Sequence, residues 1–447
     1  MFKRIAGVAP LILIGMFAGH GSRAEQAPAA ADVPTKTTFV ALANNANAVI
    51  LEPVTPDPKR SRFAILISHP EHVNNFRYFI APELAKRGYR VMMMNYYGPE
   101  HVYEEFLAPM AAAVKYLRGI PGVQKIVLAG HSSGGDELTY YQDVAENGPA
   151  ACQGPQRVYP CRGNIEGLAP ADGIMMLDAR AGAIERLIAL DPSVDSRHPR
   201  EHKPELDMFN ARNGYDVQTK SGTYTAAFER AYMQAQGARQ NHLIELASER
   251  LAKIEKGEGE YKDDEPFIVP GSSDHTYDGA ALDLADTRLL SKTHAPHPLL
   301  KADGTVSIQI VPTTRSALAD PAQMDRLDRT TQDVTVRHFL SFLAIRPQPD
   351  FAITEDRVIG VEWRSVAESV PGNVQGIKVP SLFMAGTCAT HVVFLETAYD
   401  LSAAQDKEFV AVEGGDHYFK PCKLEYGDPV KHAFDYVDSW LTKPGRF

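Results

Sequence analysis

The pattern of hydrophobic and polar positions predicts strands and helices in regular alternation over the first part of the chain. Several short runs are almost wholly apolar, such as Phe-Ala-Ile-Leu-Ile-Ser at 63–68, which is typical of parallel strands buried on both faces. Between them, apolar residues recur every three or four positions, which predicts helices. We therefore expect an α/β fold with a mostly parallel central sheet flanked by helices. The predicted strands are 37–42, 48–51, 63–68, 89–95, 125–129 and 173–177, and the predicted helices are 79–87, 103–118 and 136–146.

The alternation stops after residue 182. Residues 183–371 have a mainly helical pattern, with its longest stretch at 224–256 and one short strand candidate at 307–311. The alternation then returns in the last part of the chain. The sequence therefore predicts a core formed by 37–182 and 372–447, interrupted by a large, mainly helical cap or lid. The predicted elements of the second core segment are strands at 377–385 and 408–412 and helices at 392–403 and 430–441.

The first 24 residues have the layout of a cleavable secretory signal. Lys3 and Arg4 precede an apolar run at 5–18, and Ser22-Arg23-Ala24 supplies small residues for cleavage after Ala24. An uncleaved anchor is the alternative, but about 20 apolar residues are normally needed to span a bilayer. We expect a periplasmic or secreted protein with a flexible leader at 25–36 and no stable membrane insertion after cleavage.

Composition and charge narrow the range of partners. Hydrophobic residues make up 44% of the chain and charged residues 23%, as in ordinary globular proteins. Removing the signal would remove three basic residues and no acidic ones, so the net charge would fall from −10 to −13. An acidic surface repels phosphate backbones, which argues against nucleic acid as a partner. The same acidic charge argues against a strongly anionic substrate. Nothing in the pattern predicts the oligomeric state.

The four cysteines predict disulfides in an exported protein. Three connectivities are possible, and we favour Cys152–Cys161, which closes a short loop, with Cys388–Cys422. Two independent thiols at 388 and 422 are the alternative. The sequence has no Cys-x-x-Cys spacing, so we expect no structural zinc and no metal or other cofactor.

One motif carries nucleophilic chemistry. Ala129-Gly130-His131-Ser132-Ser133-Gly134-Gly135 lies between a predicted strand and a predicted helix. This context is what a nucleophile elbow requires, because a sharp turn holds the serine in a strained backbone conformation with its hydroxyl exposed. The alternative is a Gly/Ser-rich loop without chemistry. Ser132 is the candidate nucleophile.

A serine nucleophile needs a base, and His417 is the candidate. It follows the strand-like Val410-Ala411-Val412 and a Gly-Gly turn near the end of the chain. Open α/β sheets gather ligands and catalysts at the carboxyl ends of their strands, where His417 is expected.

Together, Gly130-His131-Ser132-Ser133-Gly134-Gly135 and Gly414-Gly415-Asp416-His417 resemble the α/β-hydrolase superfamily, in particular its serine esterases and lipases. The resemblance covers about 37–182 and 372–447 and implies the α/β-hydrolase fold. It also implies an oxyanion hole formed by the backbone N–H groups of Ser133 and of Glu71 or His72. The family usually has His-Gly in this second stretch, whereas this chain has Ser68-His69-Pro70-Glu71-His72. Metal ligation by His69 and His72 is an alternative reading.

The third catalytic residue departs from the family pattern. The acid is commonly found after the next-to-last strand, but Thr387-Cys388-Ala389-Thr390-His391 contains no carboxylate. Asp178 occupies the place that a minority of the family uses, where it would orient the histidine. Its alternative role is a helix N-cap. Glu396 and Asp416 are other candidate acids, and a dyad without an acid is also open.

These features predict an enzyme that cleaves a small-molecule carboxylic ester through an acyl-enzyme, with Ser132, His417 and Asp178 as its catalytic residues. A peptidase, a lactonase and a C–C bond hydrolase use the same elbow. A catalytically silent protein that binds a ligand or partner is the alternative. We interpret His275, His294 and His297 as surface residues. Aromatic residues of the cap could line a substrate pocket or form the cap core: Phe209, Tyr215, Tyr224, Phe228 and Tyr232.

Overall fold

The structure is a computed structural model that describes residues 33–70, 74–97, 102–163, 165–194, 198, 201–272, 279–315, 317 and 330–447. The predicted signal peptide and most of the predicted leader lie outside these residues. Glu71, His72 and His275 lie outside them as well. Among the described helices, none combines the length and apolar character needed to cross a membrane.

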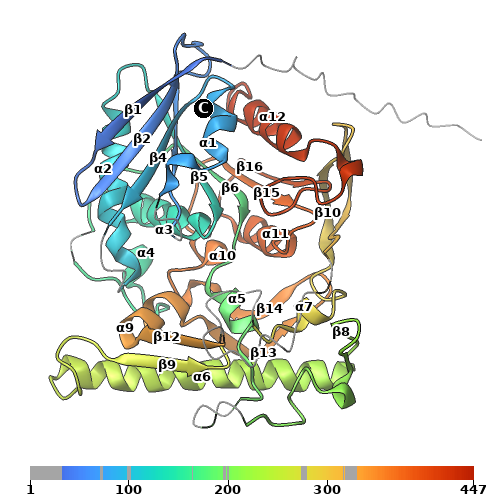
Figure 1. The fold of residues 1–447 in the computed structure, drawn as a ribbon. Helices are drawn as coiled ribbons and strands as arrows, with labels where there is room; N and C mark the ends of the chain where they lie inside the picture. Colours follow the sequence, from blue (N-terminus) through green and yellow to red (C-terminus); the bar gives the residue numbers. More distant parts are fainter. Residues whose placement is uncertain are drawn as a thin grey trace, which may run out of the picture.

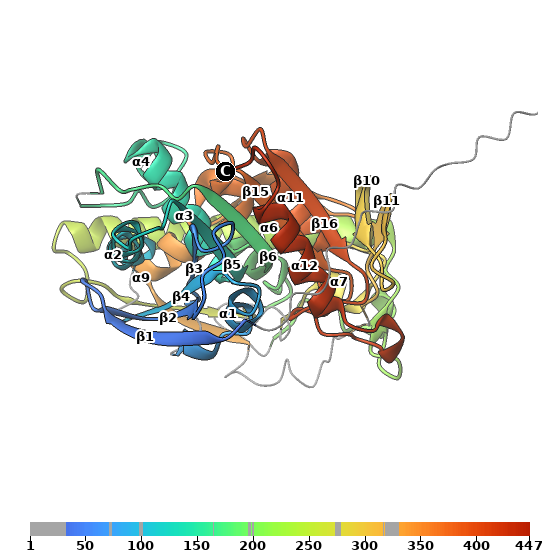
Figure 2. The same ribbon diagram turned by 90° about the horizontal axis from the view of Figure 1, so that it is seen from above.

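Ten strands within the described residues form one mixed, mostly parallel sheet (Figures 1 and 2). Its order is β1-β2-β4-β3-β5-β6-β15-β16-β10-β11. Along this order, neighbouring strands from β4 through β10 pair in parallel. The pairs β1–β2, β2–β4 and β10–β11 are antiparallel. The bounds are β1 Thr35–Ala41, β2 Ala46–Pro53, β3 Phe63–Ile67, β4 Arg90–Tyr96, β5 Lys125–Ser132, β6 Gly173–Ala179, β10 Lys292–Leu300, β11 Val306–Pro312, β15 Ser381–Gly386 and β16 Lys407–Val412. This arrangement confirms the predicted α/β class.

Successive side chains of the strands point to opposite faces, so each buried strand contributes to two cores. Ile65 packs in the core that contains α1 and α12, whereas Leu66 packs in the core that contains α2, α3 and α11. The sheet is thus covered on both sides, as its continuous apolar strands predict. The covering helices are α1 Ile80–Ala85, α2 Leu107–Arg118, α3 Gly134–Asn147, α10 Val370–Asn373, α11 Val392–Leu401 and α12 Pro429–Leu441, with the short α4 Ala150–Gln153 after α3.

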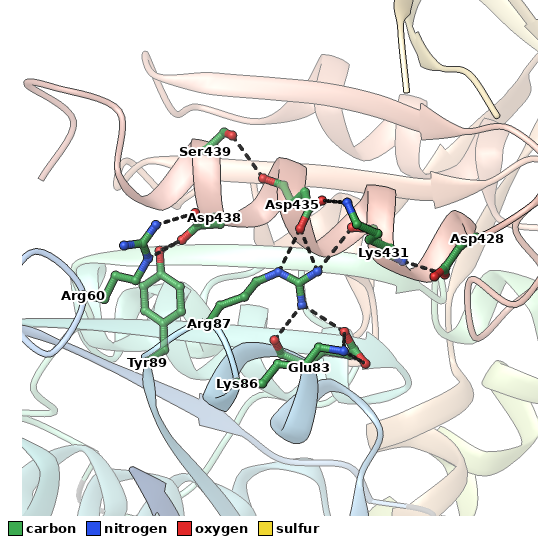
Figure 3. Close-up of polar contacts among 10 residues, drawn as sticks. All are labelled: Arg60, Glu83, Lys86, Arg87, Tyr89, Asp428, Lys431, Asp435, Asp438 and Ser439. Atoms are coloured by element: carbon green, nitrogen blue, oxygen red, sulfur yellow. Dashed lines mark hydrogen bonds and ion pairs between the residues drawn. The ribbon is translucent and has the colours of Figure 1, made fainter. Parts of the chain in front are cut away.

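Charged side chains fix the C-terminal helix α12 beside α1 (Figure 3). The Arg87 guanidinium, 6% exposed, lies 2.8 Å from Asp435 on α12. Farther along the helix, Asp438 accepts hydrogen bonds from Arg60 at 2.8 Å and from the Tyr89 hydroxyl at 2.6 Å. Burial and the nearby Asp438 raise the pKa of Tyr89, so its hydroxyl remains a donor. Since α12 follows the loop that carries His417, these contacts anchor the end of that loop.

The inserted block is less helical than the sequence pattern indicates. The long helix α6, Ala226–Glu255, runs along its outer side in Figure 1, and shorter helices accompany it. Strand pairs occupy much of the remainder, and β10 and β11 join the main sheet instead of forming a separate cap. The other elements of the block are α5 Ala183–Ile188, β7 Tyr215–Asp216, β8 Ser221–Gly222, β9 Pro266–Pro270, α7 Leu282–Ala285, β12 Thr331–Thr335, α9 Val336–His338, β13 Arg346–Ile353 and β14 Val358–Glu362.

The prediction that this block is mainly helical is therefore wrong. Strand β10 shows why its strands were hard to predict from the sequence. Pro296 and Pro298 lie within this strand, and prolines argue against a central strand because they lack an N–H donor. β10 pairs with β16 only at Leu299 and Leu300, and its pairing with β11 contains a register irregularity. The prolines thus lie where the ladder on the β16 side is not formed. The strand candidate at 307–311 corresponds to β11.

Candidate active site

Ser132 forms a strained turn between β5 and α3. Its φ of 52° lies in the left-handed region, which is uncommon for a residue other than glycine. Glycines make room for this turn, since a Cβ at Gly130 would lie 2.6 Å from the Gly135 Cα. A Cβ at Gly134 would collide with the Ser68 carbonyl oxygen. The structure therefore has the tight strand–turn–helix geometry that the motif predicts.

Asp178 lies at the same edge of the sheet, on the neighbouring strand. Ser132 pairs in register with Ala179, and the Arg180 N–H donates to the Ser132 carbonyl at 3.1 Å. Asp178 also has a left-handed backbone, with φ of 49°. The two strained residues thus stand at adjacent strand ends, where parallel sheets place their functional groups.

The Asp178 carboxylate is bound directly to His417. Its Oδ2 atom lies 2.6 Å from His417 Nδ1, and its Oδ1 accepts from the Gly386 N–H at 2.9 Å. Burial by itself raises the pKa of Asp178, but the neighbouring imidazoles His391 and His417 outweigh it, so the pKa lies below its ordinary value. An ionised carboxylate only accepts hydrogen bonds, so His417 Nδ1 carries a proton. In neutral His417 the other nitrogen, Nε2, is then free of a proton and suited to act as a base.

A second imidazole shares this carboxylate. His391 Nδ1 lies 2.9 Å from the same Asp178 Oδ2, and its Nε2 lies 3.8 Å from Glu185 Oε1. Burial lowers the pKa of His391, but Asp178 and Glu185 outweigh it and raise the pKa above its ordinary value. The sequence analysis missed this residue. The available signal was that a histidine stands in the loop where the acid was expected.

His131, also missed, contacts the backbone of the candidate base. Its Nε2 lies 2.6 Å from the His417 carbonyl oxygen, and its Nδ1 lies 2.6 Å from the Tyr78 hydroxyl. Burial, followed by the nearby His417, holds the pKa of His131 well below its usual range. The neutral ring must donate from Nε2 to the carbonyl, so Tyr78 donates to Nδ1. The residue before Ser132 thus positions the loop that carries His417.

The other candidate acids are engaged elsewhere. Glu396 accepts from the backbone N–H groups of His294 at 2.9 Å and Ala295 at 3.1 Å, and it contacts His297 Nε2 at 2.8 Å. It therefore points from α11 toward β10. Asp416 Oδ1 accepts from the N–H groups of Tyr418 and Lys420, each at 2.8 Å, which closes a local turn. Asp178 is the candidate that the structure brings to His417.

The interpretation of His297 as a surface residue is wrong. His297 is 7% exposed because its ring packs beside α11, where the buried Glu396 binds it. His294 is half-buried, and its Nδ1 lies 2.9 Å from the same carboxylate. Buried polar groups need hydrogen-bond partners, and Glu396 supplies the partner for both histidines.

Ser133 stands at the start of α3, a helix of 14 residues. A helix N-terminus directs N–H groups and a partial positive charge toward an anion, which suits the predicted oxyanion role of this backbone. The Ser133 hydroxyl lies 3.4 Å from His69 Nε2. The second predicted donor, Glu71 or its alternative His72, lies outside the described residues.

Asp178, His391 and His417 also form the one group among the described residues with the spacing of possible metal ligands. Each offers one ligand atom, and these atoms lie within 4.8 Å of one another. Both histidines, however, direct Nδ1 at the Asp178 carboxylate, and a metal ion there would have to displace both hydrogen-bonding protons. The spacing is accounted for by hydrogen bonds. His69 belongs to no such group within the described residues.

A cavity of about 570 Å³ adjoins the elbow. Ser133 and Pro70 line it on the elbow side, and Tyr103, Phe106 and Phe342 supply aromatic walls. This volume is within the range of small-molecule sites. The charged residues in its lining are Glu105, Glu137, Glu368 and Arg186, and the His338 imidazole also lines it. The cap aromatics considered from the sequence do not line it: Tyr215, Tyr224, Phe228 and Tyr232 form a hydrophobic cluster of the inserted block, and Phe209 packs against that cluster.

The predicted disulfide pairing is confirmed. Cys152 pairs with Cys161, and Cys388 pairs with Cys422, with Cα atoms 5.4 and 6.4 Å apart. The second bond joins the loop after β15 to the loop that carries His417. The same loops are linked by a 2.9 Å hydrogen bond from the Cys388 N–H to the Gly415 carbonyl.

No family model and no curated protein matches the chain. Solved structures with similarity include a hypothetical protein from Pseudomonas aeruginosa, at 14% identity and a TM-score of 0.40, covering 92% of this chain and 96% of that one. Est1E from Butyrivibrio proteoclasticus has 12% identity and a TM-score of 0.39, covering 91% and 99%. Carboxyl esterase 2 from the fungus Tuber melanosporum has 9% identity and a TM-score of 0.39, covering 95% and 90%.

Because these TM-scores are low, the fold assignment depends on the strand order and the local geometry. A mostly parallel sheet places the strained Ser132 between β5 and α3. The candidate nucleophile Ser132, the candidate acid Asp178 and the candidate base His417 follow one another along the chain in the order that α/β-hydrolases use. This protein therefore has the α/β-hydrolase fold.

Proposed function

We propose that this protein is a serine hydrolase that cleaves a carboxylic ester through an acyl-enzyme. The observation that carries the proposal is the 2.6 Å contact between His417 Nδ1 and Asp178, at the sheet edge where Ser132 forms its strained turn. A nucleophile, a base and a group that orients the base are the parts that acyl transfer requires.

The proposed reaction has two halves. Ser132 Oγ attacks the ester carbonyl carbon while His417 Nε2 takes the hydroxyl proton, and the Ser133 N–H stabilises the oxyanion. His417 then returns the proton to the departing alcohol as the C–O bond breaks. A water molecule attacks the acyl-enzyme with the same base, which releases the carboxylic acid and restores Ser132. Asp178 remains ionised throughout and stabilises the charged imidazole.

The cavity beside Ser133 supports a substrate without negative charge. Glu137 and Glu368 are 1% and 8% exposed, and Arg186 is the one arginine or lysine among the lining residues. A formal excess of carboxylates disfavours an anionic group in this partly desolvated space. The aromatic walls favour an apolar acyl or alkyl group. We therefore propose an uncharged ester as the substrate class.

A serine-reactive fluorophosphonate tests the proposal directly. We expect the folded wild-type protein to be labelled, and we expect Ser132→Ala to lose the label while remaining folded. A p-nitrophenyl ester series from acetate to decanoate, with an anilide and a lactone beside it, then separates ester hydrolysis from peptidase or lactonase activity. A folded wild-type protein that neither reacts with the probe nor cleaves any of these compounds contradicts the proposal.

A catalytically silent, ligand-binding protein was the alternative, because the usual acid position contains no carboxylate. The contact of Asp178 with His417 weighs against this alternative, since the base does have an orienting carboxylate. The export prediction stays a prediction about residues 1–24. The two disulfides support a location outside the reducing cytosol.

A further inference from the structure

The loop after β15 has a histidine where the family usually has its acid. His391 is the N-cap residue of α11 and is 2% exposed. Its imidazole lies between two carboxylates that come from different elements, Asp178 on β6 and Glu185 on α5. The proposed reaction gives this buried titratable side chain no role.

We propose that His391 is a positioning residue for the reaction at Ser132, which holds the Asp178 carboxylate in the orientation that His417 requires and offsets part of its charge. This inference rests on the proposed function. It adds a residue that acts through Asp178 and does not touch the substrate.

The hydrogen bonds of Asp178 show how the positioning works. Oδ1 accepts from the Gly386 N–H, and Oδ2 accepts from both His391 and His417. Three donors from β15, α11 and the His417 loop therefore fix the carboxylate. Without His391, the carboxylate keeps one fixed donor, the Gly386 N–H, besides the base that it must orient. A buried acceptor that loses a donor reorients or takes up water, so the His417 ring loses its fixed position.

The charges around His391 favour its protonated form. Asp178 and Glu185 face its two nitrogens, Arg180 lies beside Glu185, and the His417 ring centroid is 5.0 Å away. Two carboxylates outweigh one guanidinium, and the pKa of His391 is raised accordingly. A cation on His391 takes up part of the attraction that Asp178 exerts on a protonated His417.

Two variants separate the hydrogen bond from the charge. His391→Asn keeps an N–H donor near the position of Nδ1 but has no charge, and His391→Ala removes both. In hydrolysis of a p-nitrophenyl ester, we expect His391→Ala to lower kcat about 10²-fold with KM nearly unchanged, because the base is misplaced. We expect His391→Asn to recover much of kcat while the acid limb of its pH profile moves upward, because this variant has no positive charge beside Asp178.

His297→Asn is the matched control. His297 is also a buried histidine bound to a buried carboxylate of the same region, with 2.8 Å between its Nε2 and Glu396. This variant is expected to lose stability without moving the pH profile. If folded His391→Ala keeps the wild-type kcat and pH profile, or if His297→Asn moves the profile equally, the proposal is overturned.

Two further measurements distinguish failure of this inference from failure of the proposed function. Fluorophosphonate labelling of the wild type tests the function alone. Nitrogen-15 NMR of histidine-labelled protein tests His391 without turnover: we expect a charged ring at pH 7 whose Nδ1–H signal changes in Asp178→Asn. A neutral His391 at pH 7 overturns the charge argument even in an active enzyme. An unlabelled wild type with a charged, Asp178-bound His391 overturns the hydrolase function and with it the role in catalysis.

Discussion

Nε2 of His131 lies 2.6 Å from the carbonyl oxygen of His417. The residue before the candidate nucleophile therefore binds the main chain of the candidate base, although 286 positions separate them. Asp178 holds the ring of His417 and His131 holds its backbone, so two independent contacts define where the base stands. The Tyr78 hydroxyl completes this arrangement by donating to the other nitrogen of His131.

Replacing His131 by leucine is expected to lower kcat about 10²-fold, because the His417 carbonyl loses its donor and the base can shift. His131→Gln keeps an amide N–H at a similar reach and is expected to recover part of the loss. Since burial keeps the pKa of His131 well below its usual range, neither variant should move the acid limb of the pH profile. Steady-state kinetics from pH 5 to 9 check both statements. Equal kcat values for the leucine and glutamine variants would show that the hydrogen bond is unimportant.

Two of the candidate acids, Asp178 and Glu396, are expected to behave differently when each is replaced by its amide. Asp178→Asn should lower kcat by about 10⁴-fold, since an amide no longer selects the proton on His417 Nδ1. Glu396→Gln should leave kcat within about threefold, because Glu396 binds β10 and not the base. Rates of fluorophosphonate labelling give the same comparison without a substrate. A larger loss of activity in Glu396→Gln than in Asp178→Asn contradicts the assignment.

The sequence was sufficient for the parts of the fold that depend on local pattern. The strand predicted at 63–68 is found at Phe63–Ile67, and the helix predicted at 430–441 is found at Pro429–Leu441, since both bury apolar residues with a clear period. The nucleophile elbow could likewise be predicted, because its glycine spacing and the strand and helix on either side of it are features of the local sequence. β10 was not, because its prolines are tolerated only through its partial pairing with β16.

The contacts of the site required the folded structure. His391 and Asp178 are 213 positions apart, and no periodicity relates the loop after β15 to the end of β6. The choice between Asp178 and Glu396 depended on which way α11 turns its buried carboxylate, which the sequence pattern of that helix does not determine. The contacts of His131 were equally unpredictable, because no local sequence feature of a histidine beside the elbow serine identifies its hydrogen-bond partner.

Both disulfides are expected to stabilise the fold by similar amounts, but only one of them is expected to affect activity. In the loop-entropy description, replacing both Cys388 and Cys422 by serine lowers the free energy of unfolding by about 4 kcal/mol for their separation of 34 residues. The same change at Cys152 and Cys161, 9 residues apart, lowers it by about 3 kcal/mol. Only the Cys388–Cys422 bond joins the loop of His391 to the loop of His417, so only the loss of that bond should also reduce kcat. Urea unfolding with assays at low temperature, where both variants are folded, separates the effects. A kcat loss that is equal in the two variants contradicts the bracing role.

If the proposed hydrolase function holds, the cavity beside Ser133 is expected to set the size of the acyl group that can be cleaved. Ala108 lies at its rim on α2 and is exposed, so Ala108→Trp should reduce the space without disturbing the core. For p-nitrophenyl esters we expect kcat/KM to fall about tenfold or more for octanoate, while the acetate value changes little, because the short acyl group does not reach the rim. Lys115→Trp, an exposed position of the same helix away from the cavity lining, is the matched control and should change neither ester. If Ala108→Trp lowers both esters equally, this cavity does not bind the acyl chain, and the substrate must lie on another side of the elbow.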